Sequence, residues 1–201
     1  MPMSASLGSV RQWHWISAAL CLAGMLLFAI TGITLNHAAD IPASLEVITV
    51  EARVPQPMLK QWLAQNPQPQ RLSPPLRAWL ANRHDISMGK DLEGEWDDPE
   101  LYLSMAGPGQ DAWLALDTQS GEFLYEKTDR GWVAYFNDLH KGRDSGAVWR
   151  WFIDIFAAAC VVFCVTGLIL LWRQSSNRLT TWPLTTLGML IPLMIMLIFI
   201  H

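Results

Sequence analysis

Histidines are the side chains of this sequence with the clearest capacity for chemistry, because of where they stand relative to long apolar segments. His37 follows the first such segment and His140 precedes the second, so both would lie on the same side of a membrane. Two neutral imidazoles that face each other at one depth form the axial ligand set of a b-type haem. The alternative is that these histidines have no catalytic role. Histidines at a membrane boundary often simply form hydrogen bonds with lipid headgroups or with loops. Position alone leaves both interpretations open.

The other three histidines offer weaker alternatives. His14 stands 23 residues before His37, which is about 35 Å along a helix, so one haem cannot use both. A haem at His14 would need a second ligand from elsewhere, such as His14 of a second subunit; otherwise His14 is an interfacial residue between two tryptophans. His201 would reach the same side as His140 and is an alternative ligand, whereas His84 falls within the intervening domain.

Charged residues near these histidines have several possible uses. Asp154 is the one acid within an apolar segment, where an ionisable group is costly and is usually paired or functional. It could pair with Arg150 one helical turn earlier, orient a ligand histidine or contact a haem propionate. Lys141 and Arg143 beside His140 would neutralise propionates, attract an anionic ferric chelate or contact lipid headgroups.

Three apolar stretches must position these residues, and they predict membrane-spanning helices. Residues 15–35, 155–172 and 183–200 carry no charge. Each has about the 20 residues needed to cross a hydrocarbon core of about 30 Å. We expect an N-terminal segment (1–10), a first span (11–37), an extramembranous domain (38–147), a second span (148–173), a loop (174–181) and a third span (182–201).

The distribution of charge predicts the orientation of the chain. Arg11, Arg173 and Arg178 share one side of the predicted topology, which favours a cytoplasmic N-terminus. Residues 38–147 hold ten Lys or Arg against seventeen Asp or Glu, a net charge of −7. This domain and the C-terminus would then lie in the periplasm of a bacterium whose inner membrane holds the spans. An acidic domain is also a poor partner for nucleic acid.

The three cysteines, Cys21, Cys160 and Cys164, all fall within predicted spans. The domain outside the membrane therefore has no disulfide and no cysteine zinc site. The sequence C-x-x-C-H is absent, which excludes covalent attachment of c-type haem.

The domain between the first two spans reads as a small α+β unit. Residues 40–75 are rich in proline and predict irregular connections with one helix at 58–65, and Pro74-Pro75 opens a second helix through about residue 83. The stretch 86–135 predicts antiparallel strands, including 101–105 and a hairpin over 113–126. Residues 136–147 predict a polar, glycine-containing connection to the second span.

Several motifs resemble the PepSY-associated transmembrane family. Residues 31–37 are similar to its T-G-x-x-L-N-H end of the first helix, and 139–154 to its L-H-K-G-R element and second helix. Residues 166–172 match its T-G-x-x-L-x-W exit, and 114–123 resemble its D-x-x-x-G hairpin. The resemblance covers about residues 11–175, and the hairpin alone would be a weak signal. It implies a PepSY-like fold for the domain.

The resemblance also implies a function. Relatives in this broad group are haem-containing inner-membrane proteins, some of which reduce ferric siderophores in the periplasm. It therefore implies one haem b held by His37 and His140, a second possible in a dimer with His14, and Lys141, Arg143 and Asp154 around the site. Electrons would come from a quinol, a flavoprotein or a partner membrane subunit and pass to a ferric siderophore.

This chain departs from the membrane reductases of the group in ways that keep other functions open. It is shorter than the four-helix reductases, fits only one PepSY-like unit and lacks an inner pair of ligands. A haem-dependent ferric reductase is thus one expectation. The alternatives are a non-catalytic PepSY module that binds a periplasmic partner and a structural subunit of a larger inner-membrane complex.

Overall fold

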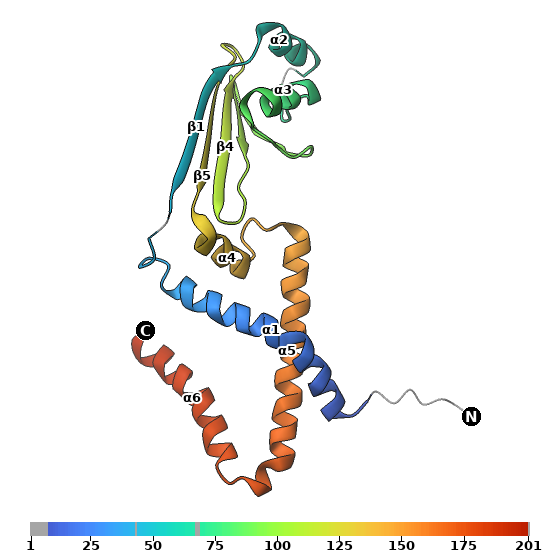
Figure 1. The fold of residues 1–201 in the computed structure, drawn as a ribbon, viewed down its shortest axis with the longest axis vertical. Coiled ribbons are helices and arrows are strands. Elements are labelled where there is room, and N and C mark those ends of the chain that lie inside the picture. The colour runs from blue at the N-terminus through green and yellow to red at the C-terminus, as the bar shows by residue number, and fades with distance from the viewer. Residues whose placement is uncertain (1–7, 43, 67–68, 201) are drawn as a thin grey trace, which may run out of the picture. The chain divides into compact units, whose positions relative to one another are not determined.

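The computed structural model describes residues 8–42, 44–66 and 69–200 and contains three long apolar helices (Figure 1). They are α1 (Val10–Asn36), α5 (Gly146–Gln174) and α6 (Thr181–Phe199), and each is long and apolar enough to cross a membrane. A five-stranded sheet with short helices lies between α1 and α5 in the chain. The expected three-span architecture with an α+β domain after the first span is confirmed.

The chain forms two compact units, and each is described on its own. The first comprises the chain up to Leu27 and the chain from Trp151 onward, which are the greater part of the three apolar helices. The second is Phe28–Arg150, which holds the last turns of α1, the whole sheet domain and the first turn of α5.

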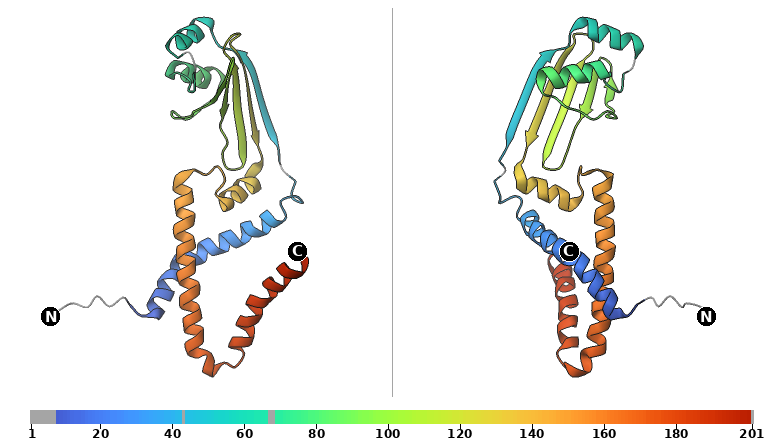
Figure 2. Two further views of the ribbon diagram at one scale, coloured as in Figure 1. Left: turned by 180° about the vertical axis from the view of Figure 1, so that it is seen from behind. Right: turned by 45° about the vertical axis from the view of Figure 1, so that its right-hand side comes forward.

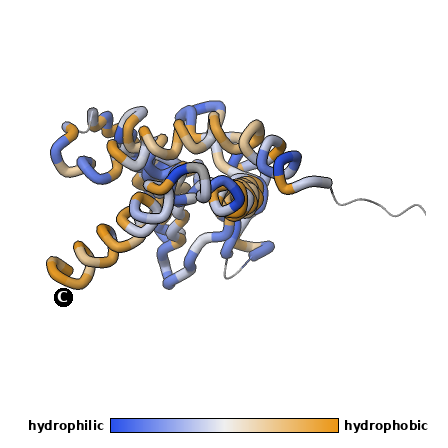
Figure 3. Tube along the Cα trace, turned by 90° about the horizontal axis from the view of Figure 1, so that it is seen from below, coloured by the Kyte–Doolittle hydropathy of each residue, from blue (hydrophilic) through white to orange (hydrophobic). Residues whose placement is uncertain are grey.

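Apolar side chains cover the outside of the helices in the first unit, as a lipid environment requires. No residue of α6 is buried within the chain, and Figure 3 shows this helix, which leads to the C-terminus, as largely hydrophobic. Gly24 of α1 marks a close approach to α5, since a Cβ there would stand 2.4 Å from the ring of Phe156. A small residue at this point lets the two backbones come together.

The sheet of the second unit is antiparallel throughout, in the order β1-β5-β4-β3-β2. The strands are β1 (Glu46–Arg53), β2 (Glu95–Asp97), β3 (Glu100–Ser104), β4 (Gln110–Asp117) and β5 (Glu122–Asp129). The expected hairpin is β4–β5, and its turn is fastened by Asp117, whose Oδ1 accepts hydrogen bonds from the backbone N–H groups of Gln119 and Ser120 at 2.7 and 3.0 Å.

Helices α2 (Gln56–Gln65) and α3 (Pro74–His84) cover one face of this sheet (Figure 2). The strands alternate, so one face carries a layer in which Leu101 pairs with Leu116 and Leu114 with Tyr125. Leu59 from α2 and Leu76 from α3 join that layer and are almost fully buried. Both helices were predicted close to these bounds.

The structure corrects the prediction for residues 40–75, because 46–53 form edge strand β1 rather than an irregular connection. The segment E-V-I-T-V-E-A-R alternates and is rich in β-branched residues, which favours a strand. Pro42 and Pro55 stand outside its two ends, where they do not interrupt the ladder. The density of proline around the strand concealed its alternation.

A second correction concerns residues 131–141, which form helix α4 (Gly131–Lys141) rather than the end of a strand and a polar connection. Gly131 adopts a φ of +80°, which ends β5, and its N–H donates to Asp129 Oδ1 at 2.7 Å. Gly142 in the left-handed region ends the helix. Gly131 and Gly142, which suggested a loop in the sequence, instead mark the start and the end of a helix.

Candidate functional site: two imidazole seats

His140 stands in the last turn of α4 and packs against the final turns of α1 within the second unit. Its Nδ1 lies 2.7 Å from Thr31 Oγ1, and its ring centre lies 4.9 Å from that of Phe28. The ring also lies over Gly32, where a Cβ would stand 3.8 Å from its Cε1. These α1 residues form what we call the outer seat: Phe28, Thr31 and Gly32.

The hydroxyl of Thr31 is the partner of His140 Nδ1. Where the hydroxyl hydrogen is directed to the backbone carbonyl of Phe28, 3.1 Å away, the hydroxyl oxygen accepts from Nδ1–H. In this tautomer, which we assign to His140, Nε2 keeps its lone pair. An imidazole held by an Nδ1–H bond with a free Nε2 is the usual state of a metal-ligating histidine.

His14 is held in the same way within the first unit. Its Nδ1 lies 3.1 Å from Thr166 Oγ1 and 3.3 Å from the carbonyl oxygen of Phe163. Its ring stacks on Phe163 at 4.8 Å and 11°. A Cβ on Gly167 would stand 3.2 Å from His14 Cε1, which is closer than ordinary contact. We call Phe163, Thr166 and Gly167 of α5 the inner seat.

The tautomer of His14 follows from the same reasoning. The Thr166 hydroxyl donates to the carbonyls of Val162 at 2.7 Å and Phe163 at 3.0 Å, so it too accepts from Nδ1–H. His14 Nε2 is thus also free to bind a metal. Both imidazoles are half-buried.

One sequence pattern, F-x-x-T-G, builds both seats. It occurs at 28–32 and again at 163–167, and the i, i+3, i+4 spacing puts its three side chains on one helix face. The sequence analysis noted each Thr-Gly pair but missed the phenylalanine and the repetition. A search for internal repeats of five residues would have found this signal.

His37 stands at the end of α1 and is exposed. Its Nδ1 lies 3.0 Å from the carbonyl oxygen of Ile33, and because a carbonyl only accepts, the hydrogen again stands on Nδ1. Within the described residues no hydrogen bond or ring contact joins His37 to His140. The six-residue step from Thr31 to His37 covers about 9 Å of rise and about 240° of rotation, so His37 and the outer seat occupy different faces of α1.

Lys141 and Arg143 form ion pairs with acids of the same unit. Lys141 Nζ lies 3.5 Å from Asp138 Oδ1, while Arg143 lies 3.2 Å from Asp144 and 3.7 Å from Asp111. Their positive charges, which the sequence suggested for propionates or a chelate, are therefore partly neutralised.

Asp138 joins several segments of this region through its carboxylate, and it was not identified from the sequence. It is almost fully buried, and its Oδ2 accepts from Arg130 at 2.8 Å and from the N–H of Gly109 at 3.0 Å. It thereby ties α4, which carries His140, to the β3–β4 turn and to the end of β5. Its partners are far apart in the sequence, so spacing gave no signal.

The remaining candidates stand apart from the seats. Asp154 is exposed on α5, and in the described part of the chain it makes no ion pair, with Arg150 or any other residue. His84 packs with Trp79 and Phe123 at ring distances of 4.9 and 5.4 Å, so it belongs to the domain core. His201 lies outside the described residues.

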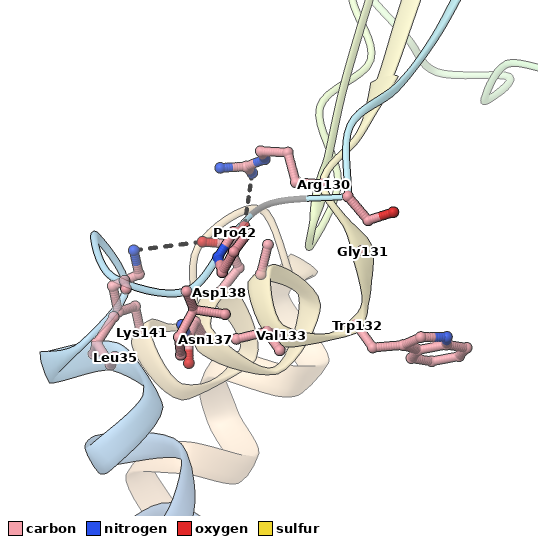
Figure 4. A pocket seen from close by; sticks show the side chains of 13 residues that line it. Leu35, Pro42, Arg130, Gly131, Trp132, Val133, Asn137, Asp138 and Lys141 are labelled. Atoms are coloured by element: carbon pink, nitrogen blue, oxygen red, sulfur yellow. Dashed lines mark hydrogen bonds and ion pairs between the residues drawn. The ribbon is translucent and has the colours of Figure 1, made fainter.

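An apolar pocket of about 320 Å³ adjoins α4 (Figure 4). Leu35 of α1, Pro42 of the connection and Val133 of α4 line it. Its polar lining residues are Ser44, Arg130, Asn137, Asp138 and Lys141. Asn137 is 5% exposed, and its Oδ1 accepts from Thr34 Oγ1 at 2.7 Å. Its amide N–H₂ has no partner among the described residues and is available to a hydrogen-bond acceptor.

No three His, Cys, Asp or Glu side chains gather as a metal-ion site in residues 8–42, 44–66 and 69–200.

Comparison with known proteins places the chain in a family. The model of a family described as "Putative PepSY_TM-like" matches residues 5–201. No curated protein and no solved structure matches the chain.

Proposed function

The chain belongs to the PepSY_TM-like family, and from that premise we propose that it is a b-type haem protein that passes electrons across or along the membrane to an acceptor outside. His37 and His140 are its outer axial ligands, and His14 holds a second haem whose other ligand comes from a second copy or a partner subunit. The N-terminus is cytoplasmic, and the sheet domain is periplasmic in this proposal.

The observation that carries the proposal is the state of the three imidazoles. Each has Nδ1 bound to an acceptor and Nε2 free: His140 through Thr31, His14 through Thr166 and His37 through Ile33. The donor chemistry of each imidazole suits haem, while His37 and the outer seat of His140 occupy different faces of α1.

Bound haem would carry one electron at a time by cycling its iron between Fe(II) and Fe(III). The chain's own residues then do three things. Thr31 and Thr166 hold the ligand rings in orientation and make them better donors. Phe163 stacks on His14 and Phe28 lies tilted beside His140, and both shield the rings from water. The pocket near Asn137 offers an apolar space with one amide donor, which suits a quinol ring as electron source.

The acceptor we propose is a ferric siderophore or other ferric chelate. Haem held by His37 and His140 would supply the one electron that converts the chelated Fe(III) to Fe(II). Arg143 is nearly half exposed although it pairs with Asp111 and Asp144, and it is the cation that we propose meets an anionic chelate.

A rapid-mixing experiment tests this function. Reduced full-length protein is mixed with a ferric hydroxamate chelate and an Fe(II)-trapping dye, and haem reoxidation and Fe(II) release are followed together. We expect both signals to rise at the same rate and in equal amounts. Reduced protein that keeps its spectrum while the chelate stays ferric contradicts the proposal. The matched control is Arg143→Gln, for which we expect slower reoxidation with an unchanged haem spectrum.

A further inference from the structure

The exposed apolar side chains of the sheet domain are concentrated at one end. Between residues 38 and 145, eight large apolar side chains are exposed among those described, and seven of them belong to α4 or to the start of β1. They are Leu45, Val47, Ile48, Trp132, Val133, Tyr135 and Phe136; the eighth is Tyr102 on β3. The start of β1 and α4 adjoin, since Glu46 pairs with Asp129 and Ser44 lies beside Gly131.

Helix α4 has two chemically different sides. Asn137 and Asp138 are buried against the rest of the unit, through Thr34 and through Arg130. Trp132, Tyr135 and Phe136 form an aromatic face instead, with ring centres 5.5–6.3 Å apart. Trp132 is 76% exposed; it lines the edge of the pocket, and Figure 4 shows its ring directed away from Asn137 and Asp138. Water is an unfavourable neighbour for three adjacent aromatic rings.

Within the second unit, helix α4 is held against the last turns of α1 and the first turn of α5. His140 and Asn137 contact Thr31 and Thr34 in the last turns of α1. Trp149 in the first turn of α5 donates from Nε1 to the carbonyl of Leu139 at 2.8 Å. Only residues 142–145 separate α4 from α5, so α4 lies beside the end of one candidate span and the start of another.

The charges near α4 point to a neutral headgroup region rather than to an anionic partner. Lys141 and Arg143 are paired with Asp138, Asp144 and Asp111, which leaves little net positive charge for anionic lipid. Apolar area is therefore the main attraction.

We propose that α4 is an interfacial helix whose aromatic face, Trp132, Tyr135 and Phe136, is inserted in the headgroup region of the adjacent lipid leaflet. Its rings sit about 5–10 Å into the boundary between headgroups and acyl chains. This anchoring fixes the depth of His140 and does not depend on haem being bound.

Spin labels in phosphatidylcholine vesicles test this proposal on the full chain. Cys21, Cys160 and Cys164 are replaced by alanine, and single cysteines are introduced as Trp132→Cys and Phe136→Cys. Tyr102→Cys is the matched control in water, and Val161→Cys in the middle of α5 is the control in lipid. Collision rates of each label with oxygen and with a water-soluble nickel chelate are measured.

We expect labels at 132 and 136 to give a ratio of oxygen to nickel collisions several-fold above that at 102 and close to that at 161, with or without anionic lipid. Free access of the nickel chelate, as at 102, would overturn the proposal in favour of an aqueous face. Low collision rates with both reagents would also overturn it, because the face would then be covered by protein. If the cysteine-free chain does not fold, quenching of tryptophan fluorescence by brominated lipid in wild type and Trp132→Phe decides the same question: an equal quenched fraction would refute insertion.

Discussion

At the scale of single residues, the Thr31 hydroxyl controls both the orientation and the tautomer of His140 (2.7 Å). Thr31→Val keeps the side-chain shape but removes the acceptor for Nδ1–H. We expect haem affinity at this seat to fall by about 10- to 100-fold, as for other supports of metal-bound histidines. Haem titration of the purified protein measures the change.

Thr34→Val is the matched control for Thr31→Val. It lies one turn later on α1, donates to Asn137 Oδ1 and makes no hydrogen bond to an imidazole among the described residues. An equal loss of affinity in both variants would show that general packing, and not the hydrogen bond to His140, is responsible.

The two seats differ in how tightly glycine is required, and this gives a second prediction. A methyl group on Gly167 would stand 3.2 Å from His14, whereas one on Gly32 would stand 3.8 Å from His140. We expect Gly167→Ala to weaken haem binding at His14 and Gly32→Ala to leave binding at His140 unchanged. Haem-to-protein ratios at limiting haem distinguish the variants, and identical ratios for both would count against the inner seat as a haem site.

At the scale of elements, the β4–β5 turn depends on one charged group. Hydrogen bonds from the backbone N–H groups of Ser120 and Gln119 lower the pKa of Asp117 below its ordinary 3.8. A carboxyl whose pKa is lower in the folded state stabilises that state above the unfolded pKa, and this contribution disappears as pH falls through the folded value.

We therefore expect Asp117→Asn to lower the free energy of unfolding at pH 6 by at most about 1 kcal/mol, because the site is open to solvent. The difference from wild type should shrink as pH falls below 3.8. Thermal unfolding of the full chain followed by near-ultraviolet circular dichroism measures it. Asp91→Asn is the control, as Asp91 has no partner in the described residues. A difference that persists unchanged at pH 3 would refute the role of the charge.

The elements also show where sequence reasoning succeeds. Long uncharged runs predicted all three spans, and the Gly-containing turn predicted the β4–β5 hairpin, because these signals are local and strong. Strand β1 and helix α4 were missed, since proline and glycine at their ends were read as signs of a loop. Those residues mark the boundaries of each element and say little about its interior.

The candidate site was only partly predictable for a related reason. His37, His140 and His14 stand out by residue type alone. Their seats depend on pairs such as Thr31 with His140, which are 109 residues apart, and Asp138 gathers groups from three separate segments. Such contacts arise from tertiary packing, so they cannot be predicted from the spacing of residues along the chain.

At the scale of the whole molecule, membrane spans supply two F-x-x-T-G faces, and each face holds an imidazole ready to bind metal. The sheet domain is joined to the end of α1 and the start of α5 through α4. Helix α4 carries His140 at one end and the aromatic face along its side. Function, on this account, depends on the helices and on α4, while the sheet serves contacts outside the membrane.

The absorption spectrum of the purified full-length protein, with its haem content, tests the central claim most directly. Wild type from haem-sufficient cells, or reconstituted with haem, should show a Soret band and, on reduction, the sharp α and β bands of six-coordinate haem b. His140→Ala should lose the outer haem, whereas His84→Phe, in the domain core, should retain it. A wild-type protein that stays colourless after reconstitution, or a His140→Ala variant with the full wild-type spectrum, would contradict the account.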